Sequence, residues 1–128
     1  MDRSPLPFPV GFTVLFVEDS ALIALDGEAI LVSLGVSRVE IAGTIEAARE
    51  ILARTAVDAA LLDLRLGDQS SLVIADQLMA HKVPFGFMTG YSDNHEIPDR
   101  FTHIPVLAKP YTDEQVGTLL RRVLGPAQ

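Results

Sequence analysis

Four short stretches of the chain carry acidic, hydroxyl or basic side chains, and each follows an apolar run. They are Glu18-Asp19, Asp63, Thr89-Gly90 and Lys109-Pro110. If the apolar runs are parallel strands, their carboxyl ends lie at one edge of a sheet, and the four stretches converge there. Three carboxylates in one place need a divalent cation and a lysine to balance their charge, and a threonine hydroxyl can then contact phosphoryl oxygens. The pattern predicts a site where an aspartate accepts a phosphoryl group.

The apolar runs have the composition of strands that are covered on both faces. The first, Phe12–Val17, is continuous, rich in β-forming residues and ends at the acidic pair. The other predicted strands are Arg38–Ala42, Asp58–Leu62, Pro84–Met88 and Ile104–Ala108. Pro105 is tolerable near the start of the last strand or on a sheet edge.

Helical patterns separate these strands. The predicted helices run from the cap Ser20 to Gly35, from Thr44 to about Arg54, from Ser70 to about Ala80, and from the capping box at Thr112–Gln115 to Leu124. Residues 91–103 have little apolar periodicity, which predicts a loop with at most one or two helical turns. Strands that alternate with helices favour a doubly wound, five-stranded parallel α/β sheet with right-handed crossovers.

The chain has 128 residues, 48% of them apolar, which is enough for one compact domain. Three prolines between Met1 and Gly11 oppose both helix and strand pairing, so residues 1–11 are expected to form an N-terminal arm. Residues 12–125 are then the folded domain, and no output domain is expected.

Charge and composition exclude several classes of function. The 17 Asp and Glu residues outnumber the 10 Lys and Arg residues, and the resulting formal charge of -7 opposes binding to nucleic acids and anionic lipid. There is no cysteine, which excludes disulfides and thiol catalysis and fits a reducing compartment. No signal peptide and no apolar run near the roughly 20 residues of a membrane span are found. We expect a soluble, cytoplasmic protein.

The ordered set of motifs resembles that of a response-regulator receiver domain of the CheY-like type, from Phe12 to Leu124. The separation between Asp19 and Asp63 is typical of that family. The resemblance implies the flavodoxin-like strand order 2-1-3-4-5 with five helices, the fourth short or poorly ordered. Phe87-Met88-Thr89-Gly90-Tyr91 also resembles the Phe-Ala-Thr-Gly-x-Tyr signature of the FAT GUY receivers, with Met88 in place of alanine. Members of that subgroup are commonly single-domain bacterial phosphorelay proteins.

The resemblance assigns a role to each candidate residue. Asp63 would be the phosphoacceptor nucleophile. Mg²⁺ would be held by Glu18, Asp19, Asp63 and the backbone carbonyl of Arg65, with Asp19 as the more direct acidic-pair ligand. Lys109 would neutralise the site and bind a phosphoryl oxygen, aimed inward by a cis bond to Pro110.

The expected switch consists of Thr89, Gly90 and Tyr91. Thr89 would bind the phosphoryl group and draw the following loop toward the site, Gly90 leaves room, and Tyr91 is a candidate mobile aromatic. Two positions depart from the family pattern: Val106 replaces the usual aromatic three residues before the lysine, and Gly67 replaces a common proline. We therefore expect the switch to run through residues 89–103, and a looser turn at Gly67.

Two other functions fit parts of the pattern. A haloacid-dehalogenase-like phosphatase uses the same aspartyl-phosphate chemistry, but it needs an acid two residues after the nucleophile, where this chain has Arg65. A degenerate receiver would act as a docking module without phosphorylation, and a phosphate sink would drain a shared kinase. Retention of all the chemical positions argues against a degenerate receiver.

The resemblance also implies partners. A histidine kinase or histidine phosphotransfer protein would supply the phosphoryl group, docking on the helix after Glu18-Asp19, and a downstream protein would bind the final helix and the 91–108 segment. No direct nucleic-acid or membrane contact is expected, and the protein would be a monomer or weak dimer. Apart from self-catalysed phosphorylation and dephosphorylation of aspartate, no enzyme activity is expected.

Overall fold

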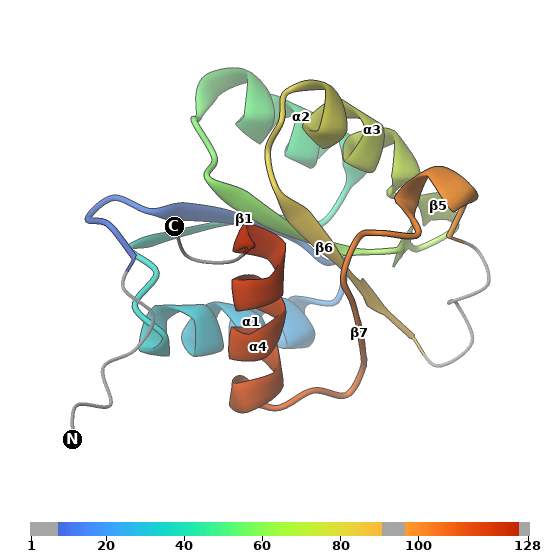
Figure 1. The fold of residues 1–128 in the computed structure, drawn as a ribbon. Coiled ribbons are helices and arrows are strands. Elements are labelled where there is room, and N and C mark those ends of the chain that lie inside the picture. Colours follow the sequence, from blue (N-terminus) through green and yellow to red (C-terminus); the bar gives the residue numbers. More distant parts are fainter. Residues whose placement is uncertain (1–7, 91–96, 126–128) are drawn as a thin grey trace.

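The sheet has five parallel strands in the spatial order β2-β1-β3-β6-β7 (Figure 1). This computed structural model describes residues 8–90 and 97–125 of the chain. The sheet strands are β1 (Thr13–Val17), β2 (Arg38–Ala42), β3 (Ala59–Asp63), β6 (Phe85–Thr89) and β7 (Val106–Ala108). Counted along the chain, this is the predicted order 2-1-3-4-5, and the α/β fold class is confirmed.

Helices cover both faces of the sheet, as continuous apolar strands require. The helices are α1 (Ala21–Ser33), α2 (Ile45–Arg54), α3 (Leu72–Ala80) and α4 (Asp113–Leu124). In Figure 1, α2 and α3 lie on one face and α1 and α4 on the other. Each face has its own core: Phe85, Phe87 and Phe101 pack edge to face on the α2–α3 side, and Phe16 and Met88 lie on the α1–α4 side.

The predicted N-caps of α1, α2 and α4 and the predicted glycine after α1 are confirmed. The side chains of Ser20 and Thr44 accept hydrogen bonds from backbone N–H groups in the first turns of α1 and α2. Thr112 and Gln115 form the predicted capping box of α4. Gly35 ends α1 with φ 105°, a left-handed conformation that favours glycine.

Two elements begin later in the structure than predicted. The last strand, predicted from Ile104, begins at Val106, because Pro105 has no N–H for the ladder and contributes only its carbonyl to Phe87. The third helix, predicted from Ser70, begins at Leu72, because Gln69–Ser70 pairs as β5 with β4 (Arg65–Leu66).

The segment between β6 and β7 has no α-helix among its described residues. A 3-10 turn at Asp99–Phe101 takes the place of the fourth of the five expected helices, preceded by Pro98. The expectation of a short fourth helix agrees with this turn. Residues 91–96, and with them Tyr91, lie outside the described residues.

The β4–β5 hairpin was not predicted from the sequence. Gly67 takes φ 62° at its tip, and the Gly67 N–H donates to Asp19 Oδ2 over 2.8 Å. The turn that was expected to be loose is therefore held by a short antiparallel ladder and by an acid of the predicted site. None of the helices in the described ranges is long and apolar enough to span a membrane.

Candidate functional site

The carboxyl ends of four parallel strands bring the predicted residues together. Glu18 and Asp19 directly follow β1, Asp63 ends β3, Thr89 ends β6, and Lys109 directly follows β7. Backbone hydrogen bonds hold these ends in register: Lys109 N–H donates to the Thr89 carbonyl over 2.8 Å, and Glu18 N–H donates to the Ala42 carbonyl over 2.9 Å. The convergence predicted from strand order is present in the structure.

Three carboxylates form the acidic side of the site. One oxygen each from Glu18, Asp19 and Asp63 lies within 4.8 Å of the others. Glu18 and Asp63 are buried, with 2% and 5% of their surface exposed, whereas Asp19 is exposed. Close, buried carboxylates repel each other, so the cluster needs positive charge to remain ionised.

Lys109 supplies that charge from the opposite side. Its Nζ lies 2.8 Å from Glu18 Oε1 and 2.9 Å from Asp63 Oδ2, so a single ammonium pairs with both buried acids. Burial opposes the charge on Lys109, but its bonds to Glu18 and Asp63 outweigh burial and raise its pKa. The Lys109–Pro110 peptide bond is cis, as the family resemblance implied.

Asp63 remains easier to protonate than an ordinary aspartate. Burial raises its pKa to about 6, opposed by the hydrogen bond from Lys109 and reinforced by the charge of Glu18. The Arg65 backbone N–H also donates to this carboxylate, which favours the ionised form. One lysine therefore does not fully balance the charges, and the site favours a further cation.

Local hydrogen bonds orient the two other acids. The Ser20 N–H donates to Glu18 Oε2 over 3.0 Å, which leaves Oε1 facing Lys109. Asp19 Oδ2 accepts from the Gly67 N–H, so the β4–β5 turn closes over this carboxylate. The chain thus positions Glu18 and Asp19 through neighbouring backbone groups.

The carboxylate set fits Mg²⁺. This ion prefers oxygen ligands and commonly binds through one or two carboxylates while retaining water. The exposed Asp19 is open to solvent beside the two buried acids, as such a site requires. The role expected for the Arg65 carbonyl stays a prediction, although Arg65 lies next to the acids at the start of β4.

Two of the three expected switch residues, Thr89 and Gly90, are among the described residues. Thr89 is fully buried at the end of β6, opposite Ala108 of β7, and Gly90 is half-buried after it. Val106, where many receivers have an aromatic, is half-buried in β7 opposite Phe87. The roles assigned to Thr89, Gly90 and Tyr91 stay predictions.

Tyr111 is a neighbour of the site that the sequence reasoning missed. Its hydroxyl oxygen is buried and has no hydrogen-bond partner among the described residues. Burial, together with the negative charge of Glu18, raises the pKa of Tyr111 to about 12. Its position two residues after Lys109 was the available signal.

Known proteins are similar to this chain in sequence and fold, although no protein-family model matches it. SdrG from Sphingomonas melonis Fr1 is 37% identical, and the match covers 88% of this chain and 96% of SdrG with a TM-score of 0.78. The chain belongs to the response-regulator receiver domains. A structure described as the BeF3-activated conformation of SdrG matches with a TM-score of 0.75 and 35% identity over 91% of this chain and 98% of that one.

Two forms of the regulator PhyR are also similar. The response-regulator REC domain of PhyR from Erythrobacter litoralis is 26% identical, with 93% of this chain and 97% of that domain covered and a TM-score of 0.79. The phyllosphere-induced regulator PhyR of Methylorubrum extorquens is 31% identical over 114 residues, 87% of this chain but only 43% of its own length. Both PhyR proteins are described as regulators, the one from Erythrobacter litoralis as a response regulator. These similarities support a place for this chain in a two-component or phosphorelay system.

Proposed function

We propose that this receiver accepts a phosphoryl group from phosphohistidine onto Asp63 and passes the signal on by protein contact. The observation that carries the proposal is the ammonium of Lys109, held 2.9 Å from Asp63 and 2.8 Å from Glu18 beside a third carboxylate. The site is charged and partly shielded from water. A dianionic phosphoryl group and a divalent cation that bind together would balance its charges. The description of one SdrG structure as BeF3-activated supports the proposal.

The reaction needs little beyond positioning. A carboxylate oxygen of Asp63 attacks the phosphorus, an O–P bond forms, and the P–N bond to the donor imidazole breaks with its electron pair on nitrogen. Lys109 already lies within hydrogen-bond distance of Asp63, so its ammonium can meet a phosphoryl oxygen after a small displacement. Attack of water on the phosphorus of the acyl phosphate breaks its bond to the Asp63 oxygen, releases inorganic phosphate and restores the carboxylate.

Glu18, Asp19 and Asp63 would hold the Mg²⁺ that we propose as cofactor, with the Arg65 carbonyl as a further ligand. When bound, the ion neutralises charge on the phosphoryl oxygens in the transition state. The chain's own part is to keep the three acids within 4.8 Å of one another and to orient Asp19 through the Gly67 N–H.

Thr89 would report the modification. It is buried beside the acceptor strand, and its backbone carbonyl binds the Lys109 N–H, so phosphoryl binding and the β6–β7 connection share one residue. A hydroxyl that moves to a phosphoryl oxygen would displace Gly90 and the segment after it. We propose that this segment, including Tyr91, carries the change.

The phosphodonor would dock on α1. Three large apolar side chains are exposed on this helix: Leu22, Leu25 and Val32, at 82%, 62% and 55%. Their spacing of three and seven residues places them along one stripe, which suits packing against a helix of a histidine kinase or histidine phosphotransfer protein. Leu22 lies only three residues after Asp19, so a donor helix on this stripe passes close to the site.

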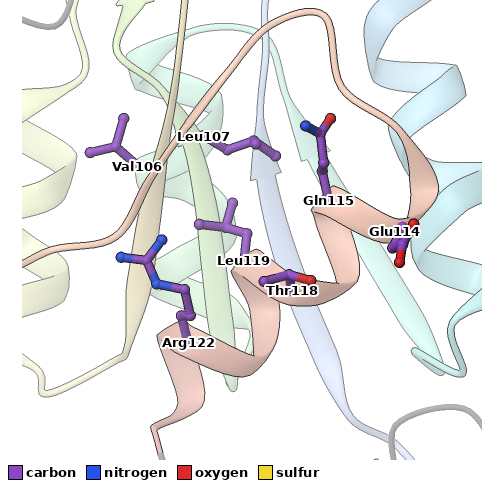
Figure 2. A pocket seen from close by; sticks show the side chains of 7 residues that line it. All are labelled: Val106, Leu107, Glu114, Gln115, Thr118, Leu119 and Arg122. Carbon is purple, nitrogen blue, oxygen red and sulfur yellow. The ribbon is translucent and has the colours of Figure 1, made fainter.

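A second surface would carry the output. Figure 2 shows a groove between β7 and α4, where the side chain of Leu107 points toward Leu119 of the helix. Val106 lines the groove from β7 with its side chain turned to the other face of the sheet, and Gln115, Thr118 and Arg122 lie along the helix. β7 is an edge strand that directly precedes Lys109, so a displacement of the lysine would reach this groove. A downstream protein partner is proposed here, with the protein acting in the cytoplasm as a monomer or weak dimer, without direct contact to nucleic acid or membrane.

Intact-mass spectrometry with a small phosphodonor tests the proposal. Incubation with acetyl phosphate and Mg²⁺ should add one phosphoryl group that is stable in acid and labile in base, and Asp63→Asn should abolish it. Asp68→Asn is the matched control, since Asp68 is an exposed acid outside the carboxylate cluster. Lack of an adduct on the parent chain, with a receiver of known activity phosphorylated in parallel, would favour the docking-module function.

A further inference from the structure

A pocket lies at the amino-terminal ends of β6 and β7, at the opposite edge of the sheet from the acidic site. Its volume is about 510 Å³, within the range of ligand-binding pockets. It is lined by Met79, Lys82, Val83, Pro84, Phe85, His103, Ile104, Pro105, Arg122 and Val123. Nothing in the proposed phosphorylation chemistry uses this surface.

The pocket combines an apolar floor with a basic rim. Lys82, His103 and Arg122 are exposed, whereas Val83, Ile104 and Val123 are half-buried and Phe85 is buried. No Asp or Glu is among the described residues that line it, although the chain has 17 acids against 10 Lys and Arg. None of the three basic residues forms an ion pair with another described residue. Positive charge is therefore concentrated here on an otherwise acidic protein.

Lys82 occupies this rim at a conformational cost. It has φ 60°, the only positive φ of a non-glycine residue in the described ranges. Lys82 N–H donates to Met79 and Val83 N–H donates to Leu78, which is a Schellman motif at the end of α3. The left-handed position of such a motif favours glycine, because the Cβ of any other residue comes too close to the neighbouring carbonyl oxygen.

The end of α1 provides an internal comparison. Gly35 N–H donates to Val32 and Val36 N–H donates to Leu31, so the same motif is built with the favoured glycine. Helix termination alone does not require a lysine at position 82. A glycine at position 82 would end the helix equally well but would place no ammonium beside the pocket.

We propose that this pocket binds a short acidic segment of a partner protein, with an apolar side chain on the floor and carboxylates at Lys82, Arg122 and His103. The apolar floor favours a leucine or phenylalanine side chain over a purely ionic ligand. The formal charge of -7 disfavours polyanions, which would extend from the pocket onto acidic surface. The surface is separate from α1 and from the acidic site, so the inference goes beyond the proposed phosphotransfer.

Two-dimensional NMR on the isotope-labelled full chain tests this inference. The probe is an acetylated tetrapeptide amide of glutamate, leucine, phenylalanine and glutamate, compared with the same peptide carrying lysine for glutamate. The acidic peptide should shift amides at Val83, Phe85 and Ile104, and the basic peptide should not. In a separate arm, 3-phenylpropionate tests whether a free apolar carboxylate is preferred.

Variants separate recognition from stability. Lys82→Gly should weaken the acidic peptide by about twofold to fivefold, the worth of one exposed charge pair, while the melting temperature stays the same or rises because the strained position is relieved. Lys82→Asn, which also tolerates this conformation, should weaken binding similarly. Arg122→Gln should weaken binding, and the control Arg121→Gln, one position along α4 and outside the lining, should not.

Three results would overturn the inference. The first is that the amide shifts are absent, or are equal for the acidic and basic peptides. The second is that both Lys82 variants bind the acidic peptide as well as the parent chain does. The third is that 3-phenylpropionate binds and the acidic peptide does not. The last result would assign the pocket to a small free carboxylate. All the readouts are made without phosphodonor, so failure here is distinguishable from failure of phosphorylation at Asp63.

Discussion

Asp63 and Lys109 show how one residue pair prepares a buried site for charged ligands. Lys109 bonds to Glu18 and Asp63 at once, and still burial raises the pKa of Asp63 to about 6. An ionised Asp63 therefore lowers the stability of the folded protein near neutral pH. Binding of a cation beside Asp63, the proposed phosphoacceptor, would reduce this cost.

Asp63→Asn should stabilise the protein near neutral pH. The folded pKa of about 6 lies above the ordinary value of 3.8, so Asp63 contributes stability below about pH 3.8 that is lost as the pH rises through 6. Asparagine does not ionise, so the variant does not lose this stability as the pH rises. Lys109 keeps its ion pair with Glu18. The variant should gain on the order of 1–3 kcal/mol in unfolding free energy above pH 6 and lose this advantage near pH 4.

Urea unfolding of both chains between pH 4 and 8, without divalent ions, measures the difference. Asp68→Asn is again the control, because its carboxylate is exposed. A constant difference across this range would show that burial does not raise the pKa of Asp63.

Tyr111 offers a second residue with a predictable pH dependence. Its folded pKa of about 12 lies above the ordinary value of 10.0, so the stability that it contributes is complete below pH 10 and is lost as the pH rises through 12. Tyr111→Phe should therefore remove the fall in folding stability above pH 10 that comes from ionisation of Tyr111. Because the hydroxyl has no partner among the described residues, the variant should differ from the parent by no more than about 1 kcal/mol at pH 7.

Thermal unfolding at pH 7 and at successive values up to pH 11.5 is the measurement. If Tyr111→Phe destabilises the protein at neutral pH by much more than about 1 kcal/mol, the hydroxyl forms a hydrogen bond that is absent from the described contacts.

At the scale of elements, α1 is unusual because both of its faces are apolar. Ala24, Gly27, Ile30 and Leu31 are buried against the sheet, while Leu22, Leu25 and Val32 are exposed. Gly27 allows this close packing, since a Cβ there would overlap the ring of Phe16. A row of exposed large apolar side chains is unusual on a surface helix, so this outer stripe supports the proposed docking of a protein partner on α1.

The double variant Leu22→Ser/Leu25→Ser should slow phosphotransfer from a histidine phosphotransfer protein by at least about tenfold, the effect of losing roughly 1.4 kcal/mol of apolar contact. Phosphorylation by acetyl phosphate should not change, because that donor needs no docking surface. Val73→Ser, an apolar residue with 40% exposure on α3, is the matched control. Equal slowing with both donors would point to damage at Glu18-Asp19 rather than to lost docking.

The connection from β6 to β7 is anchored at its far end. Arg100 forms two hydrogen bonds of 2.9 Å with Asp76 of α3, and Phe101 is buried between Phe85 and Phe87. The guanidinium of Arg100 also lies over the Phe101 ring, 4.6 Å from its centroid. The signal that we propose to start at Thr89 would therefore be confined between the end of β6 and this anchor.

At the scale of the whole molecule, Mg²⁺ should stabilise the fold. The three carboxylates belong to the ends of β1 and β3, and a ligand that binds only the folded chain raises stability by mass action. At an ion concentration 100 times the dissociation constant, the gain is about 2.7 kcal/mol. We expect a higher melting temperature of the parent chain in Mg²⁺, and a smaller rise for Asp63→Asn.

Differential scanning calorimetry in matched ionic strength, with Na⁺ in place of Mg²⁺, controls for general screening. Equal shifts for the parent chain and for Asp19→Asn/Asp63→Asn would place the ion outside the acidic cluster.

Much of this protein was predictable because its signals are local. Alternating apolar runs and capped helices specify the element order, and the parallel order then requires Glu18, Asp63, Thr89 and Lys109 to meet. Ser20, Thr44 and Thr112 cap the helices they were expected to cap. The β4–β5 hairpin could not be predicted this way, because two-residue strands have no periodicity and this one depends on a left-handed Gly67 and on contact with Asp19.

The sequence by itself determined the receiver architecture and the identities of the chemical groups, since both depend on residue type and order along the chain. Only the tertiary structure decided that one ammonium is shared by Glu18 and Asp63, that the Tyr111 hydroxyl is buried beside them, and that Lys82 and Arg122 meet at one pocket. These facts depend on distances between segments far apart in the chain. Burial and charge balance arise only when the sheet and helices pack together, and no local pattern encodes them.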